Sequence, residues 1–326
     1  MRLKNYTVIR YRSTEATGWN DFLKTAKNAT FLFNRNFMDY HADRFPDFSL
    51  MVYNEERLVA LLPANIDNGT ILSHQGLTYG GLVYGNLKLQ EVILVFREIL
   101  LFLQQQGILK LVYKSIPSVY CLKPAQEVEY ALFLAKAQIV RRDALSVLAH
   151  NGENEVSDLR KRGIKKGIKS GLVVKEENHF EDFWNQILIP NLESRHQAKP
   201  VHSLQEIELL ASRFPENIRQ FNVYHQNKIV GGTTVFETEN VAHAQYIAAN
   251  ETRAELGSLD FLFNELTHNI FREKKFFDFG ISNEMQGRKL NSGLSYWKES
   301  FGATTITQDF YEVATANYTL LDDVFI

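Results

Sequence analysis

The stretch FFDFGISNEMQGRKLNSGLSYWKESFGA (276–303) joins a short apolar strand to an amphipathic helix near the C-terminus. Leu294, Trp297 and Phe301 recur at helical spacing, which predicts a single apolar face. Lys298 follows Trp297 and is expected at the edge of that face, about 100° round the helix. From such an edge, a long side chain can pack its stem while its charged end reaches into a cleft.

Two other segments suggest an internal repeat. LMVYNEERLVALLPAN (50–65) and FNVYHQNKIVGGTTVF (221–236) each contain two short strands around a polar tip, which is typical of a hairpin. The two hairpins lie about 170 residues apart, and a strand, an amphipathic helix and a short strand are expected after each. The expected elements are 78–84, 87–106 and 109–113 after the first hairpin, and 241–249, 257–273 and 276–279 after the second.

This repeat favours an α+β fold, in which two tandem domains each hold a mixed α/β sheet flanked by helices. The polar stretch HNGEN (150–154) is the expected boundary, so the predicted domains are 1–150 and 151–326. One larger mixed sheet is the alternative that the pattern leaves open.

The composition is that of a globular protein, with 45% hydrophobic and 23% charged residues. A net charge of −2 argues against a sequence-independent nucleic-acid binder. The single cysteine, Cys121, excludes a disulfide framework, and the nine histidines lack a metal-binding spacing, so no metal is expected. No signal peptide and no apolar run of the ~18 residues needed for a membrane span are seen. We therefore expect a cytoplasmic protein.

The segment DLRKRGIKKGIKSGLVVKEE (158–177) predicts a strongly basic helix. Gly163 and Gly167 permit close approach of another backbone, and Gly171 is the expected C-terminal cap. Such a cluster in a chain of negative net charge suggests a site for phosphates or a carboxylate, and a solvated helix face is the alternative. The candidate substrate-binding residues are Arg162, Lys165 and Lys169, which we expect beside an interdomain cleft.

Three stretches of this sequence resemble Fem-type peptidyltransferases and their relatives, the GNAT-fold N-acyltransferases with two tandem acyltransferase-like domains. LRKRGIKKGIKSGLVV (159–174) is similar to the basic helix and strand that open their second domain. ELGSLDFLFNEL (255–266) is similar to the helix start after their fourth strand. The stretch 276–303 is similar to their strand ending in Phe-Asp-Phe-Gly, loop and Trp-Lys-Glu-x-Phe-Gly helix. The resemblance covers 156–311 and extends weakly over 45–113.

The resemblance implies an acyl-transfer site at the second domain. Lys298 matches a lysine whose ammonium can stabilise the oxyanion formed when an amine attacks a carbonyl. Asp278 would take a proton from that amine, and Tyr246 would face the same region. The alternatives are a lysine that packs beside Trp297, a structural hydrogen bond at Asp278 and a core position for Tyr246.

The donor loop NETRAELGSLDF (250–261) departs from the family pattern, Arg/Gln-x-x-Gly-x-Gly/Ala. Arg253, Gly257 and Ser258 are the candidate contacts for the pyrophosphate of acyl-CoA, which helix N-termini and backbone N–H groups bind. Only one of the glycines is present. The other donor of the family is aminoacyl-tRNA, whose users often carry a coiled-coil insertion that this chain lacks.

The first hypothesis is therefore an N-acyltransferase that uses an acyl thioester. Its acceptor would be the amine of an amino sugar, an amino acid or a cell-envelope precursor. The alternatives are an aminoacyl-tRNA-dependent peptidyltransferase of the Fem type and a catalytically silent GNAT-like binding protein.

Overall fold

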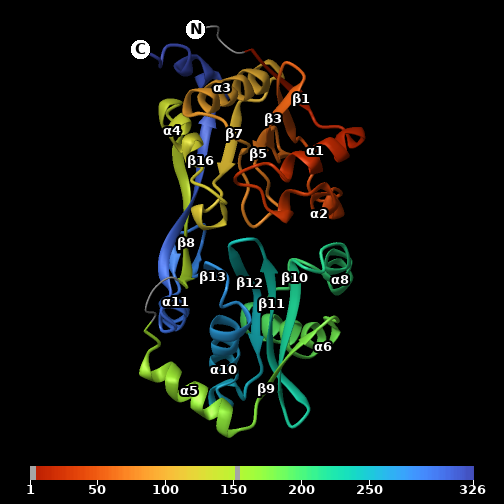
Figure 1. The fold of residues 1–326 in the computed structure, drawn as a ribbon, viewed down its shortest axis with the longest axis vertical. Helices are drawn as coiled ribbons and strands as arrows, with labels where there is room; N and C mark the ends of the chain where they lie inside the picture. The colour runs from red at the N-terminus through yellow and green to blue at the C-terminus, as the bar shows by residue number, and fades with distance from the viewer. Residues whose placement is uncertain (1–4, 151–154) are drawn as a thin grey trace. The chain divides into compact units, whose positions relative to one another are not determined.

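The computed structural model describes residues 5–150 and 155–326 and divides the chain into two compact units (Figure 1). Unit 1 contains the described residues up to Asp143 together with Gln286–Arg288 and Thr307–Ile326. Unit 2 contains the described residues of Ala144–Met285 together with Lys289–Ile306. The expected boundary at 150–154 falls mostly on 151–154, which lie outside the described residues. The predicted duplication into 1–150 and 151–326 stays a prediction.

Two long strands contribute residues to both units. They are β8 (Gln138–Ala149) and β16 (Thr304–Ala314), which are neighbours in the sheet. The last part of β16 pairs antiparallel with β7 (Lys110–Lys114), and Val313 is buried in the core of unit 1. The C-terminal segment therefore completes a unit that is otherwise built mainly from the first half of the chain.

Unit 1 contains the first predicted hairpin, formed by β2 and β3, within a small antiparallel sheet of order β1-β2-β3-β6. A second group of strands follows the order β4-β5-β7-β16-β8. The remaining elements of unit 1 are β1 (Tyr6–Arg10), β2 (Leu50–Asn54), β3 (Arg57–Leu62), β4 (Asn65–Asp67), β5 (Thr70–Leu72), β6 (Val83–Tyr84), α1 (Ala16–Leu23), α2 (Arg35–Met38), α3 (Leu89–Gln105) and α4 (Glu127–Leu134).

The prediction of a strand at 78–84 is wrong for most of that segment, since only Val83–Tyr84 is a strand. Gly80 lies against the backbone of Ser73 so closely that a β-carbon has no room there. Gly81 has a φ of +95° and donates its N–H to the Ser73 carbonyl. These glycines fold the segment into a loop, because their backbone must approach and turn where other residues cannot. The helix expected at 87–106 is confirmed as α3, whose apolar face lies in the unit 1 core.

Unit 2 is built on a sheet of order β16-β8-β13-β12-β11-β10-β9. The second predicted hairpin is confirmed as β10 and β11, and β12 matches the expected strand at 241–249. The remaining elements are α5 (Asp158–Lys169), β9 (Val173–Glu177), α6 (Glu181–Phe183), α7 (Ile189–His196), α8 (Leu204–Arg213), β10 (Ile218–His225), β11 (Lys228–Glu237), β12 (Val241–Ala249), α9 (Arg253–Leu256), α10 (Ser258–Glu265), β13 (Phe276–Ile281), β14 (Asn283–Glu284), β15 (Lys289–Leu290) and α11 (Ser292–Glu299).

The basic helix α5 lies along the side of α10 (Figure 1). Ser157 caps its N-terminus by accepting from the Arg160 N–H, and Gly171 follows its C-terminus with a φ of +65°. Gly163 and Gly167 are the two buried residues of α5, and both face α10. The two helices approach closely because neither glycine has a side chain.

We expect Gly167→Ala to destabilise the protein by about 1–3 kcal/mol, the usual cost of overpacking. Its new β-carbon would lie 2.6 Å from the Phe261 β-carbon, which belongs to a packed helix. Gly18→Ala in α1 is the matched control, since no atom lies within 4 Å of the added carbon and alanine favours a helix. Urea unfolding measures both variants. Equal stability of the two would show that α5 is not closely packed.

Candidate active site

The strands β12 and β13 diverge within the sheet of unit 2. They pair in parallel over Val241–His243 and Phe276–Asp278. Beyond this ladder, β12 continues to Ala249, whereas β13 shifts its register against β8 between Asp278 and Ile281. The last register pair, His243 and Asp278, therefore lies where the two strands separate.

Asp278 and His243 form a hydrogen-bonded pair at this point. Asp278 is fully buried, and its Oδ2 lies 3.0 Å from Nδ1 of His243. Its other oxygen accepts from the Gly280 N–H at 2.7 Å. Because an ionised carboxylate can only accept, Nδ1 is the donor of this hydrogen bond. A carboxylate that orients a histidine in this way is the usual support of a general base.

Lys298 is the buried residue of α11, with only 2% of its surface exposed. Its Nζ donates to the carbonyl oxygens of Gly280 at 2.9 Å and Ile281 at 2.6 Å. These carbonyls lie in the part of β13 where the ladder to β8 is irregular, so the ammonium satisfies polar groups that the sheet does not pair regularly. Burial lowers the pKa of Lys298 to about 8, and the negative charge of Asp278 opposes that shift.

This arrangement corrects the expected orientation of α11. Sequence spacing predicted Leu294 on the buried face and Lys298 at its edge, but Leu294 is 38% exposed and Lys298 is inside. The polar end of β13 is the physical reason. Two buried carbonyls without a donor would cost more free energy than one partly exposed leucine.

Aromatic packing holds α11 against β13 and α10. The ring of Trp297 meets Phe263, Phe279 and Phe301 edge-on, at centroid distances of 5.3, 6.1 and 5.2 Å. Such contacts fix the position of a helix beyond what burial alone provides. Trp297 thereby sets the place from which Lys298 reaches the end of β13.

Tyr246 lies farther along β12 and contacts a different group. Its hydroxyl is 2.6 Å from Nδ1 of His202 and accepts from the His202 N–H, and its ring packs against Trp184. The recorded contacts thus join Tyr246 to His202 and Trp184, while Asp278 and Lys298 lie together. Its catalytic role stays a prediction.

Of the predicted pyrophosphate contacts, Arg253 begins α9, while Gly257 and Ser258 lie at the start of α10. Gly257 is in the left-handed conformation with a φ of +68°, and the Gly163 carbonyl of α5 lies directly against it. Ser258 is fully buried, whereas Arg253 is exposed. Gly257 thus lies against α5, and the Ser258 side chain is closed to solvent.

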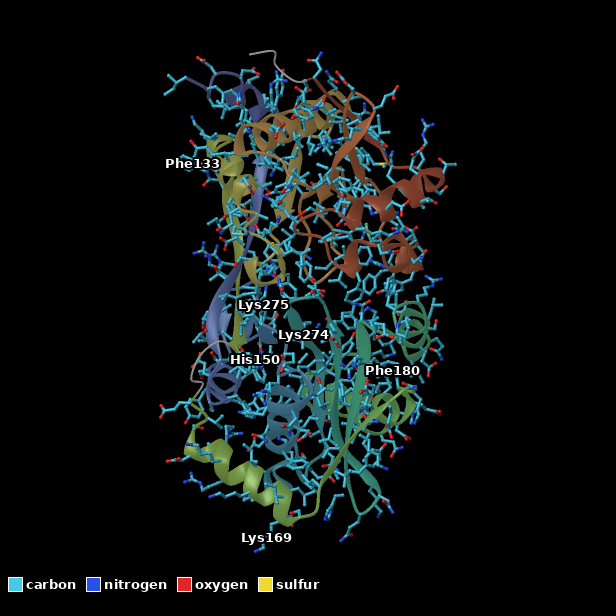
Figure 2. All side chains as sticks on the ribbon, in the orientation of Figure 1. Phe133, His150, Lys169, Phe180, Lys274 and Lys275 are labelled. Carbon is cyan, nitrogen blue, oxygen red and sulfur yellow. The ribbon has the colours of Figure 1, made fainter. Side chains whose placement is uncertain are left out.

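The predicted substrate-binding residues Arg162, Lys165 and Lys169 are all exposed on α5. Lys169 extends into solvent at the end of the helix (Figure 2). Arg160 differs from them, since it pairs with Asp260 of α10. Burial raises the pKa of Asp260, and the charge of Arg160 opposes the rise. Contact of the three exposed residues with an anionic ligand stays a prediction.

Within residues 5–150 and 155–326, no group of three or more His, Cys, Asp or Glu side chains is placed to hold a metal ion. None of the helices described has the length and apolar character needed to cross a membrane.

Solved structures with a similar fold span nearly the whole chain. FemX matches with a TM-score of 0.67 at 8% identity, over 97% of this chain and 99% of its own. A tandem GNAT protein from the clavulanic acid biosynthesis pathway matches with a TM-score of 0.51 at 14% identity, over 95% and 99%. The chain has the tandem GNAT fold. The C-terminal domain of a putative lysylphosphatidylglycerol synthetase from Agrobacterium fabrum also matches, with a TM-score of 0.55 at 13% identity over 81% and 84%.

The tandem GNAT fold confirms the fold class expected from the three resembling stretches. No protein-family model matches the sequence, and no curated protein matches it. At such low identities the solved structures establish the fold alone.

Sequence reasoning missed His243 as a partner of Asp278. The two residues are 35 positions apart, and they meet only because β12 and β13 pair in parallel. No sequence motif links two residues at this separation, so their contact could not be predicted. The position of His243 in the expected strand at 241–249 was the available signal, and that position is equally compatible with a core residue.

We expect Lys298→Met to lower the free energy of unfolding by about 1–3 kcal/mol, because two carbonyls at the end of β13 lose their donor. Lys289→Met, at an exposed position of β15, is the matched control and should be neutral. Urea unfolding at pH 7 measures both. A fully stable Lys298→Met would mean that the lysine does not support β13.

Proposed function

We propose that this protein transfers an acyl group to an amine at the point where β12 and β13 diverge. The observation that carries the proposal is the cluster of Asp278, His243 and Lys298. In this cluster, an oriented imidazole and a buried cation lie together where β12 and β13 separate. A titratable group with a pKa shifted by burial, next to an oriented imidazole, is typical of an active site.

In the proposed reaction, Nε2 of His243 accepts a proton from the attacking amine as its nitrogen bonds to the acyl carbon. Asp278 holds the ring and stabilises the imidazolium that forms. The carbonyl oxygen becomes an oxyanion, and the positive charge of Lys298 lowers its energy. When the tetrahedral intermediate collapses, the bond to the donor breaks, and the proton on His243 can pass to the leaving group.

Two of the Lys298 N–H groups are used by carbonyls, so its contribution is mainly electrostatic. The pairing of β12 with β13 ends at His243, and β12 continues beyond it. Tyr246 follows on the same strand and is proposed, as the family resemblance implies, to face the acyl group.

An acyl thioester such as acyl-CoA is the donor that the sequence predicts, with Arg253 at its phosphates. Aminoacyl-tRNA is a second candidate, and one observation favours it. The start of α10 lies beneath α5, so Gly257 and Ser258 do not offer an open diphosphate site. The exposed Arg162, Lys165 and Lys169 suit a large polyanion, whose binding would weaken with salt. The proposed acceptors are an amino sugar, an amino acid or a cell-envelope precursor.

The deciding experiment combines binding and transfer. Acetyl-CoA, longer acyl-CoAs and charged tRNA are screened by thermal shift, since a ligand of the native state raises Tm. Each donor that binds is then incubated with UDP-amino sugars and amino acids, and the acylated amine is detected by mass spectrometry. Binding of donors without any transfer across the panel would favour the silent binding protein.

We expect Asp278→Asn and His243→Gln each to reduce kcat by about 10²–10⁴-fold, the usual contribution of general-base catalysis. His179→Gln, an exposed histidine on the same unit, is the matched control. Single-turnover transfer and Tm are measured together. Full turnover in a stable His243→Gln protein would remove the histidine from the reaction.

The activity should also fall on the alkaline side. The charged form of Lys298 is required, and its pKa is about 8, so transfer should be present below that pH and decline above it. A Lys298→Arg protein should be slow, because the planar guanidinium does not present one compact charge, and its rate should not show this decline. A wild-type rate that stays constant to pH 10 would contradict the role of the ammonium.

A further inference from the structure

Unit 1 contains a second candidate site, which does not depend on the proposed acyl transfer. A cleft of about 370 Å³ lies over β5, β7, β16 and β8, and all its lining residues belong to unit 1. Its volume is near the lower end of the range for small-molecule sites. It therefore suits a compact ligand.

The apolar wall of the cleft comes from the strand face opposite the core. Leu111 and Tyr113 of β7 point into the core that includes α3, so the alternating residues Val112 and Lys114 point the other way. Leu72 of β5 lies beside them and also lines the cleft. Val140 of β8 completes the wall and is 40% exposed.

Two cations flank one aromatic ring in this cleft. The Arg141 guanidinium lies 4.5 Å from the Phe310 ring centroid, and Nζ of Lys114 lies 5.6 Å from it. Nζ donates to the carbonyls of His74 and Leu77, so the recorded contacts use two of its three protons. The side of Arg141 formed by Nε and Nη2 binds Asp143, which leaves Nη1 to face a ligand.

The net charge of the cleft suits a ligand that carries one negative charge. Lys114 and Arg141 together carry two positive charges, and Asp143 carries one negative charge. Burial lowers the pKa of His74 to about 3, so its ring adds no charge at neutral pH. The site is thus left with a net charge of about +1 when Lys114 is protonated, too little for a phosphate dianion.

We propose that this cleft binds a monocarboxylate with a small apolar body. One carboxylate oxygen accepts from Lys114 and the other from Nη1 of Arg141, while the apolar body packs on Val112, Val140 and Phe310. The carboxylate comes either from a free organic acid or from the C-terminus of a short peptide, and the two share this chemistry.

The protonation of Lys114 supports the assignment. Burial, together with the nearby charge of Arg141 and against the opposing charge of Asp143, lowers its pKa to about 7. A bound carboxylate would favour the charged form of Lys114, because a nearby negative charge raises the pKa of an amine. Affinity should accordingly weaken as the pH rises from 6 to 9, with His74, Arg141 and Asp143 as the charged or titratable groups around the amine.

Methyl NMR of the full chain tests the proposal, with Leu72, Val112 and Val140 as reporters. The probes are hexanoate, its neutral analogue hexanamide, N-acetyl-Ala-Leu, the C-terminal amide of that peptide, and inorganic phosphate. We expect hexanoate or the free-acid peptide to shift the reporters, and the stronger of the two identifies the source. The two amides should not shift them.

Three variants make the test specific. Arg141→Gln should raise Kd about tenfold, because a hydrogen bond to a charged group is lost. Val140→Asp places a negative charge at an exposed position of the wall and should abolish binding without unfolding the protein. Arg142→Gln is the control, since this neighbouring side chain pairs with Asp309 and does not line the cleft. Equal shifts with the amides, stronger shifts with phosphate, or equal losses in Arg141→Gln and Arg142→Gln would overturn the proposal.

Discussion

The ammonium of Lys298, held by two carbonyls at the end of β13, is the interaction on which the candidate active site depends. It joins α11 to the point where the sheet opens. A buried cation is costly unless it is paired or hydrogen-bonded, and here both backbone carbonyls and nearby Asp278 reduce that cost. The same contacts that stabilise the strand end keep a positive charge beside the proposed reaction, so structure and chemistry depend on one group.

Aromatic side chains pack around α11, and the helix α5 packs closely against α10. Trp297 and its phenylalanine neighbours position α11, while the glycines of α5 bring that helix onto the start of α10. The close approach places α5 against Gly257, which the family resemblance assigns to a diphosphate. Arg160 reinforces it through Asp260, which also accepts from the Trp297 indole at 3.4 Å. Binding of a diphosphate donor at Gly257 therefore depends on how closely α5 packs against α10.

Unit 1 uses its sheet differently. One strand face is covered by the core that contains α3, and the opposite face carries Lys114 and Phe310 in a cleft. The alternation of a strand is what allows the same short segment to build a core and line a site. Two candidate sites of different chemistry thus arise from similar elements, and in both a lysine, buried at 298 and half-buried at 114, donates to backbone carbonyls.

Elements with local signals could be predicted from the sequence. These are the paired hairpins, the helix α3, the strand β12 and the basic helix with its Gly171 cap, because periodicity and glycine positions act over a few residues. The tandem GNAT fold class was expected from the resemblance of three stretches to a known family. Three other features depend on how distant segments pack: His243 meets Asp278, Lys298 rather than Leu294 is buried, and residues 73–82 form a loop. The return of the C-terminal strand to unit 1 also depends on this packing. Each of these depends on which strands pair and which backbone groups they leave unsatisfied, and that information lies between segments far apart in the chain.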